Sequence, residues 1–176
     1  YVVVGIMFIS LFRMSGLVNQ VLGMLGLYNE IDWLGNPKLS LLTVIILDIW
    51  MWSGTHMIIY LAGLQSIPNE LYESSRIDGA NEFLQFRHIT IPMLMPAFNI
   101  NITLSFIGGL RVFEQVLILT NGGPGHSSTV INVLVYEYFS QGFFGKSTSI
   151  EMMLSLFIFV ISLFITGFFR KREVEV

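Results

Sequence analysis

The sequence predicts an all-α protein embedded in a membrane, and its composition indicates this in two ways. Of its 176 residues, 53% are hydrophobic and only 12% are charged, with a mean hydropathy of +0.70. Its apolar residues gather in long segments, and a helix of roughly 20 such residues crosses a hydrocarbon core of about 30 Å. The net charge of −3 leaves no basic surface for nucleic acid, and the absence of cysteine excludes disulfides and thiolate chemistry.

The first apolar run, residues 1–12, is too short to cross a membrane and is interpreted as the end of a span. The sequence opens within this run and without methionine, so we expect one or more further spans before Tyr1. Residues 13–39 are predicted to form a loop. Within it, the spacing of Leu17, Val21 and Leu25 predicts a short helix on the membrane surface.

Residues 40–63 are the first complete predicted span. Asp48, Trp52 and Thr55 repeat at i, i+4 and i+7, which places a carboxyl group, an indole and a hydroxyl on one stripe. An ionisable group at that depth is costly, so Asp48 should face a pathway or a partner rather than lipid. The alternative, for Asp48 and for His56 beside the stripe, is an interhelical hydrogen bond with only a packing role.

The second predicted span covers residues 93–119. One of its faces carries residues spaced at i, i+3, i+4 and i+7, which are Ser105, Gly108, Gly109 and Val112. This face either lets a neighbouring helix approach closely or leaves room for a bound solute. A turn-rich loop over residues 120–149 and a last span over residues 150–169 complete the order.

Residues 68–92, PNELYESSRIDGANEFLQFRHITIP, form a polar island between the first two complete spans. Ser66 is predicted to cap a helix that has Pro68 in its first turn, and Gly79 is predicted to end that helix. A second short amphipathic helix should follow. Its apolar face carries Ala80, Phe83 and Phe86.

The distribution of basic residues predicts the orientation. The polar island and the C-terminal tail together hold Arg76, Arg87, Arg170, Lys171 and Arg172, whereas the alternate loops hold Arg13, Lys38 and Lys146. Because short basic loops tend to stay in the cytoplasm, the island and the C-terminus are predicted to be cytoplasmic. The loop over residues 120–149 is predicted to face outward.

The spacing within the island resembles the EAA loop of ABC importer permeases, usually written E-A-A-x-x-x-G followed nine residues later by I-x-L-P. Here the pattern reads Glu73-Ser74-Ser75, then Gly79, then Ile89-x-Ile91-Pro92. Both alanines are serine and the leucine is isoleucine, and serine is small enough to preserve close packing. In that family the loop is a pair of coupling helices that sits in a cleft of the cytoplasmic ATPase subunit.

The resemblance extends over nearly the whole chain, through GLVNQVLGMLGL with WLGNP, LAGLQSIPNELYESSRIDGA and FEQVLILTNGGP. Together these segments resemble the maltose-type carbohydrate permeases of bacterial ABC importers. This implies a type I importer fold, in which residues 1–176 are the C-terminal part of a six-span transmembrane domain containing the loop at residues 68–92. It also implies a multi-pass subunit of the bacterial cytoplasmic membrane that moves a sugar or oligosaccharide into the cell.

The resemblance further implies a set of partners. These are a second homologous permease, two ABC ATPase subunits that hold ATP and Mg, an extracytoplasmic solute-binding protein, and membrane lipid. The sequence contains no G-x-x-x-x-G-K-[ST] phosphate-binding loop. We therefore expect this chain to bind no cofactor or metal and to have no catalytic residues of its own.

Two groups of site residues follow from the resemblance. The expected ATPase-coupling residues are Glu73, Ser74, Ser75, Asp78, Gly79, Ala80, Phe83 and Phe86. In the resembling maltose permease the sugar lies between the spans that flank the loop, and the matching positions are Trp50, Met51, Trp52, Thr55, Ser105, Gly108, Gly109 and Val112. The second span lacks the asparagine amides of the maltose case at these positions, so the solute, its pose or the solute-binding subunit can differ.

Other classes of protein explain less of the sequence. A permease for a non-sugar solute would share the loop but matches the GLVN and TNGGP segments poorly. A secondary transporter or channel would also carry Asp48 and Arg111, yet would have no reason for the loop pattern. An intramembrane hydrolase is disfavoured because His56, His88 and His126 form no H-E-x-x-H or other metal-binding spacing.

Overall fold

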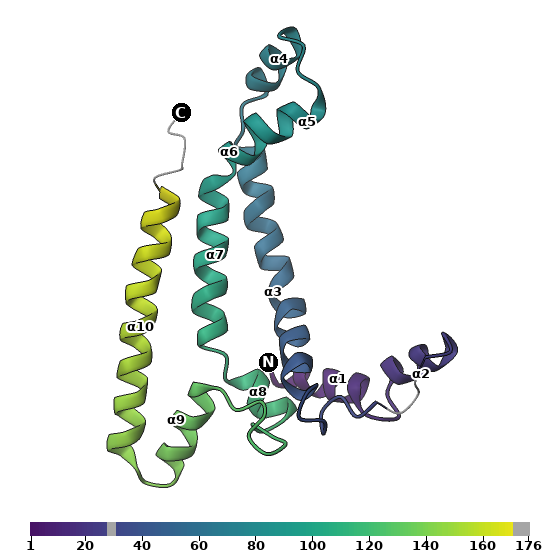
Figure 1. The fold of residues 1–176 in the computed structure, drawn as a ribbon, viewed down its shortest axis with the longest axis vertical. Coiled ribbons are helices and arrows are strands. Elements are labelled where there is room, and N and C mark those ends of the chain that lie inside the picture. Colours follow the sequence, from purple (N-terminus) through teal and green to yellow (C-terminus); the bar gives the residue numbers. More distant parts are fainter. Residues whose placement is uncertain (28–30, 171–176) are drawn as a thin grey trace. The chain divides into compact units, whose positions relative to one another are not determined.

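A computed structural model describes residues 1–27 and 31–170, and within them the chain folds into helices joined by turns (Figure 1). The backbone divides into two compact units. Unit 1 comprises Tyr1–Trp52 with Leu110–Ser155, and unit 2 comprises Ser53–Gly109 with Leu156–Val176.

By length and composition, three helical stretches among the described residues can cross a membrane: Val2–Met24, Ser40–Gln65 and Phe144–Arg170. A fourth is formed if Glu82–Met93 and Met95–Leu110, which meet at a bend of 60°, act as one span.

Unit 1 is built around an apolar core. Its elements are α1 (Val2–Phe12), α2 (Leu17–Met24), the first half of α3 (Ser40–Gln65), α8 (Glu114–Leu119), α9 (Ile131–Ser140) and the start of α10 (Phe144–Arg170). The core residues are Phe8, Phe12, Val44, Leu47, Val116, Leu119 and Val133. Burying these side chains joins segments that are far apart in the sequence.

Unit 2 contains the second half of α3, the loop that follows it, α7 (Met95–Leu110) and the end of α10. The loop comprises α4 (Asn69–Ile77), α5 (Glu82–Gln85), a π-helix (Phe86–Thr90) and α6 (Ile91–Met93). The second half of α3 runs beside α7, and α4 and α5 lie beyond their ends (Figure 1). A small core of Ile67, Leu94 and Ala97 joins the loop to these two helices.

The close approach of α3 and α7 depends on Gly63. A Cβ atom added at Gly63 would lie 2.9 Å from the Cβ of Ala97 and 3.0 Å from the Cδ2 of Leu94. Contacts this short are shorter than ordinary van der Waals separations, so only glycine fits here without displacing α7.

Two predicted helices are confirmed and a third is only partly correct. The span predicted over residues 40–63 is α3, and the short helix predicted around Val21 is α2. The span predicted over residues 93–119 is not one continuous helix, because α7 ends at Leu110 and α8 begins at Glu114. Adjacent glycines at the end of α7 weaken the helix, and Phe113 leaves the helical conformation with φ −145° and ψ −65°.

The last span also differs from its predicted bounds, since α10 begins at Phe144 rather than at residue 150. A polar residue is accommodated in its first turns because the Ser147 hydroxyl donates to the Val135 carbonyl oxygen at 2.9 Å. The preceding loop contains α9, which the sequence did not predict. Lys171 and Arg172, expected after this span, lie outside the described residues.

Replacing Gly63 with valine should destabilise unit 2, because the new side chain would collide with α7. We expect a loss of about 1–3 kcal/mol in the free energy of unfolding, measured by thermal denaturation of the purified protein in detergent. Gly167→Val is the matched control, since Gly167 is also helical and a Cβ there meets no atom of the described residues within 4 Å. Equal stability of the two variants would contradict the close packing at Gly63.

Candidate functional site

The first arm of the loop over residues 68–92 is α4. Pro68 is its N-cap, with φ −62° and ψ 131°, and no side chain caps the helix. The predicted Ser66 cap is therefore wrong, because the Ser66 hydroxyl donates instead to the carbonyl oxygen of Gly63 at 2.8 Å. The extended backbone of Pro68 and its fixed φ are sufficient to start the helix.

The first arm ends at Gly79, as predicted. Gly79 has a φ of +81°. Its N–H donates to the carbonyl oxygen of Arg76, and the N–H of Ala80 donates to the carbonyl oxygen of Ser75. This pair of hydrogen bonds is a Schellman motif, which satisfies carbonyl groups at the end of α4 and needs a left-handed residue. Gly79 thereby reverses the chain in a tight turn.

The second arm begins at Asn81, whose side-chain oxygen accepts a hydrogen bond from the N–H of Leu84 at 2.9 Å. This N-cap starts α5, which continues as the π-helix and then as α6. Glu82–Met93 then meets Met95–Leu110 at the 60° bend, so the second arm leads directly into α7.

Polar side chains join the two arms on their inner side. Gln85 is only 6% exposed, and its Nε2 donates to the hydroxyl of Ser75 at 3.0 Å and to the carbonyl oxygen of Tyr72 at 3.4 Å. The hydroxyls of Tyr72 and Thr90 lie 2.8 Å apart. The inner surface of the loop is therefore polar and hydrogen-bonded.

Apolar side chains lie on the outer side of the loop. Ile77 is 88% exposed, Phe83 is 69% exposed and Phe86 is 53% exposed. Among the other predicted coupling residues, the exposed ones are Glu73, Ser74, Asp78 and Gly79, and the partly buried ones are Ser75 and Ala80. Ile77 was not among the predicted coupling residues, although its place just before the Asp-Gly turn indicates exposure.

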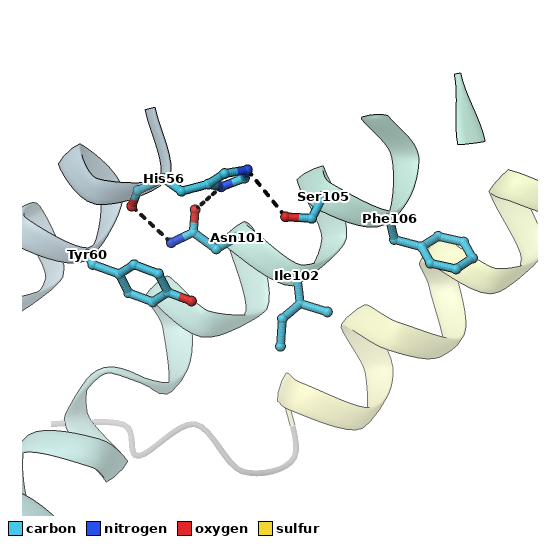
Figure 2. Close-up of a pocket in the computed structure, with 6 residues that line it drawn as sticks. All are labelled: His56, Tyr60, Asn101, Ile102, Ser105 and Phe106. Carbon is cyan, nitrogen blue, oxygen red and sulfur yellow. Dashed lines mark hydrogen bonds between the residues drawn. The ribbon is translucent and has the colours of Figure 1, made fainter. Parts of the chain in front are cut away.

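A second candidate region is a groove of about 400 Å³ in unit 2 (Figure 2). Its lining residues come from α3 and α7 and are His56, Tyr60, Asn101, Ile102, Ser105 and Phe106. Of the eight residues predicted to bind solute, only Ser105 lies here. Asn101 and Tyr60 were missed, because nothing in the sequence pairs positions on two different helices.

His56 is held between two residues of α7. Its Nδ1 lies 2.6 Å from the Oδ1 of Asn101, and the Nδ2 of Asn101 donates to the His56 carbonyl oxygen at 3.3 Å (Figure 2). Since the second bond fixes the amide orientation, Nδ1 must carry the proton and donate to Oδ1. The Nε2 of a neutral ring is then an acceptor, and the Ser105 hydroxyl lies 3.3 Å from it.

The other predicted solute-binding residues divide between the two units. In unit 1, the ring of Trp50 packs on Phe8 with centroids 5.5 Å apart, Met51 and Val112 pack against the core, and Trp52 is exposed. In unit 2, Thr55 is exposed, and a Cβ added at Gly108 or Gly109 meets no described atom within 4 Å.

Asp48 forms an interhelical hydrogen bond, which was the alternative to its facing a solute pathway. Its Oδ1 accepts from the Nε2 of Gln115 on α8 at 3.0 Å, and Gln115 is buried. A carboxyl group in an apolar helix thus has a polar partner within unit 1.

Comparison with known proteins places these features in a family. Residues 1–173 match the family described as "Binding-protein-dependent transport system inner membrane component". The chain belongs to this family. It is therefore an inner-membrane component of a transport system, and its described residues include several helices apolar enough to cross a membrane.

Relatives of this chain include proteins named for carbohydrate transport. The chain is 38% identical to the trehalose/maltose transport system permease protein MalF of Thermococcus litoralis, over 89% of the chain and 53% of that protein. It is 36% identical to the arabinooligosaccharides transport system permease protein AraP of Halalkalibacterium halodurans, over 98% of the chain and 56% of that protein. The chain thus spans about half the length of the curated relatives it matches.

A solved structure confirms the fold class. A crystal structure of a bacterial ABC transporter involved in the import of the acidic polysaccharide alginate matches with a TM-score of 0.82 and 28% identity. The match covers 97% of this chain and 60% of the solved chain. The predicted all-α integral membrane fold of a type I ABC importer permease is confirmed.

Proposed function

We propose that this chain is part of the permease subunit of an ATP-driven importer that moves a carbohydrate into the cell. Membership of the binding-protein-dependent family supports an importer, and the relatives named for trehalose, maltose and arabino-oligosaccharides support a carbohydrate. The observation that carries the proposal is the loop of α4 and α5, which is internally hydrogen-bonded and exposes apolar side chains.

Energy for transport reaches the permease from partner subunits in this proposal. The sequence has no phosphate-binding loop for ATP, so two ABC ATPase subunits hold ATP and Mg and hydrolyse the nucleotide. Large exposed apolar side chains beside charged ones are typical of protein interaction sites. The outer side of the loop, with Ile77, Phe83 and Phe86, is therefore the docking surface for one ATPase subunit.

The remaining partners follow from the same proposal. A second homologous permease completes the transmembrane pathway, and an extracytoplasmic binding protein delivers the solute. The loop and the C-terminus face the cytoplasm, where the ATPase subunits lie, and the loop over residues 120–149 faces outward. The excess of basic residues in the loop and tail supports this orientation.

The groove beside His56 is part of the solute pathway in this proposal. Sugars bind where hydrogen-bonding groups converge next to apolar or aromatic surface, and the groove combines His56, Tyr60 and Ser105 with Ile102 and Phe106. The Nε2 of His56 is an acceptor for a sugar hydroxyl. Its long 3.3 Å contact with Ser105 is readily exchanged for one to the solute.

Replacing Gly79 with aspartate should uncouple ATP hydrolysis from uptake, because the turn needs a φ of +81°. The strain of a side chain in this conformation is about 1–2 kcal/mol, so we expect uptake per ATP hydrolysed to fall about fivefold or more. The complete importer in proteoliposomes, supplied with radiolabelled maltose, trehalose or an arabino-oligosaccharide, provides the measurement.

Gly142→Asp is the matched control for this change. Gly142 has a φ of +83° and lies in the turn before α10. As at Gly79, a Cβ added there would meet none of the described atoms within 4 Å. Gly142→Asp should undergo the same strain without uncoupling. Normal uptake per ATP in Gly79→Asp would contradict the proposed role of the loop.

Two substitutions of His56 should separate its packing role from its solute role. Asparagine places an amide nitrogen near the Nδ1 position and keeps the bond to Asn101, whereas glutamine places its polar end near Nε2. We expect His56→Gln to lower the melting temperature, because the bond to Asn101 is lost. We expect His56→Asn to lower carbohydrate uptake about threefold, which corresponds to the net free energy of one hydrogen bond. If His56→Asn transports at the wild-type rate, the groove is a packing contact only.

A further inference from the structure

The two arms of the loop are tied together at two levels. Near the Gly79 turn, the Gln85 side chain of the second arm reaches across to Ser75 and to the Tyr72 carbonyl oxygen of the first arm. Nearer α7, the Thr90 hydroxyl meets the hydroxyl of the same Tyr72. Gln85 and Thr90 are 6% and 8% exposed, so both ties are shielded from competing water.

The π-helix explains why both ties reach the same arm. Gln85 and Thr90 are five residues apart, and in an α-helix of 3.6 residues per turn they would face different sides. Between them the backbone is π-helical over Phe86–Thr90, and the N–H of Ile91 donates to the carbonyl oxygen of Phe86. Hydrogen bonds that join residues five apart bring such residues onto one side, and such segments are frequent at functional sites.

The ties also fix the outer side of the loop. With Gln85 and Thr90 turned inward, neighbouring positions of the second arm face outward, and Phe83 and Phe86 are exposed. Ser75 accepts from Gln85 and donates to the Tyr72 carbonyl oxygen at 2.9 Å, so its hydroxyl is used within the loop. The apolar outer surface therefore rests on a hydrogen-bonded inner frame.

We propose that Gln85 and Tyr72 are positioning residues that make the loop a rigid lever between its docking surface and α7. This inference rests on the proposed function and adds the residues that transmit movement. Without the ties, a displacement of the outer surface would bend the loop at Gly79. With the ties, the same displacement is transmitted through Thr90 and α6 to the start of α7. Neither residue needs to touch the ATPase subunit or the solute.

The test is the amount of solute imported per ATP hydrolysed by the complete importer in proteoliposomes. Gln85→Met keeps the size of the side chain and removes both donated hydrogen bonds. We expect the ratio to fall about threefold, with ATP hydrolysis retained. This factor corresponds to the net free energy that one intramolecular hydrogen bond contributes. Gln65→Met is the control, since Gln65 is exposed at the end of α3, immediately before the loop.

A second variant covers the case in which Gln85→Met assembles poorly. Tyr72→Phe removes one hydroxyl from the second tie and leaves the ring packed beside Ile67 and Leu94. It should also lower the ratio while the ATPase subunits still co-purify with the permease. Ser75→Thr, which retains a hydroxyl, should keep a higher ratio than Ser75→Ala, an order that a loss of packing alone would not produce.

The possible outcomes separate this inference from the proposed function. A lower ratio in Gln85→Met and Tyr72→Phe, with assembly and melting temperature unchanged, supports the lever. A wild-type ratio in assembled Gln85→Met, or in Tyr72→Phe should Gln85→Met fail to assemble, overturns it. If the unmodified importer takes up none of maltose, trehalose and arabino-oligosaccharides on addition of ATP and binding protein, the carbohydrate proposal fails instead.

Discussion

Hydrocarbon offers no hydrogen-bonding partner to a polar side chain, and this constraint governs the polar groups of the apolar helices. Polar groups at membrane depth must therefore be paired inside the protein or lie along a pathway. Asp48 pairs with Gln115, and His56 pairs with Asn101, in both cases between helices distant in the sequence. These pairs specify which helix faces meet, since apolar contacts with lipid and with protein are nearly equivalent.

In the loop over residues 68–92, polar side chains are also paired on the inside, but the exposed apolar side chains have no lipid around them in the proposal. Its inner side is polar, through Gln85, Ser75 and the Tyr72 and Thr90 hydroxyls, while Ile77 and Phe83 are exposed on its outer side. A loop that met only water would gain by burying these apolar side chains. Their exposure is consistent with the proposed ATPase contact, and the inner hydrogen bonds keep the surface in one shape before the partner binds.

The groove and the loop are connected through unit 2. The His56 to Asn101 bond joins α3 to α7, Gly63 lets the same two helices approach, and the core of Ile67, Leu94 and Ala97 joins both to the loop. Movement of the loop therefore acts on helices that line the proposed solute groove. This continuity within one compact unit is the physical basis for coupling in the proposal.

Sequence reasoning succeeded where local chemistry decides the structure. A long apolar run predicted α3, and the Asp-Gly step predicted the left-handed turn at Gly79. It failed where the outcome depends on competing or distant contacts. The helix breaks after Leu110, where two glycines weaken it and Phe113 leaves the helical conformation. The first turns of α10 contain Ser147, whose hydroxyl is bonded to α9.

For the candidate sites too, local features were predicted from the sequence and contacts between distant residues were not. The loop could be located from its spacing, yet Gln85 and Thr90 face the same arm because of the π-helix between them, which has no simple sequence signal. His56 was noted as a neighbour of the polar stripe, but its partner lies 45 residues away on α7. Only folding brings these two residues together.

The central claim is that the outer side of the loop contacts a cytoplasmic ATPase subunit. Because the chain contains no cysteine, a single one can be introduced at exposed Phe83 and, as a control, at exposed Ser140, the last residue of α9. A bifunctional thiol crosslinker applied to the assembled importer should join Phe83→Cys, but not Ser140→Cys, to the ATPase subunit. Labelling of Phe83→Cys by a membrane-impermeant reagent added outside intact cells, with no crosslink to the ATPase, would contradict the account.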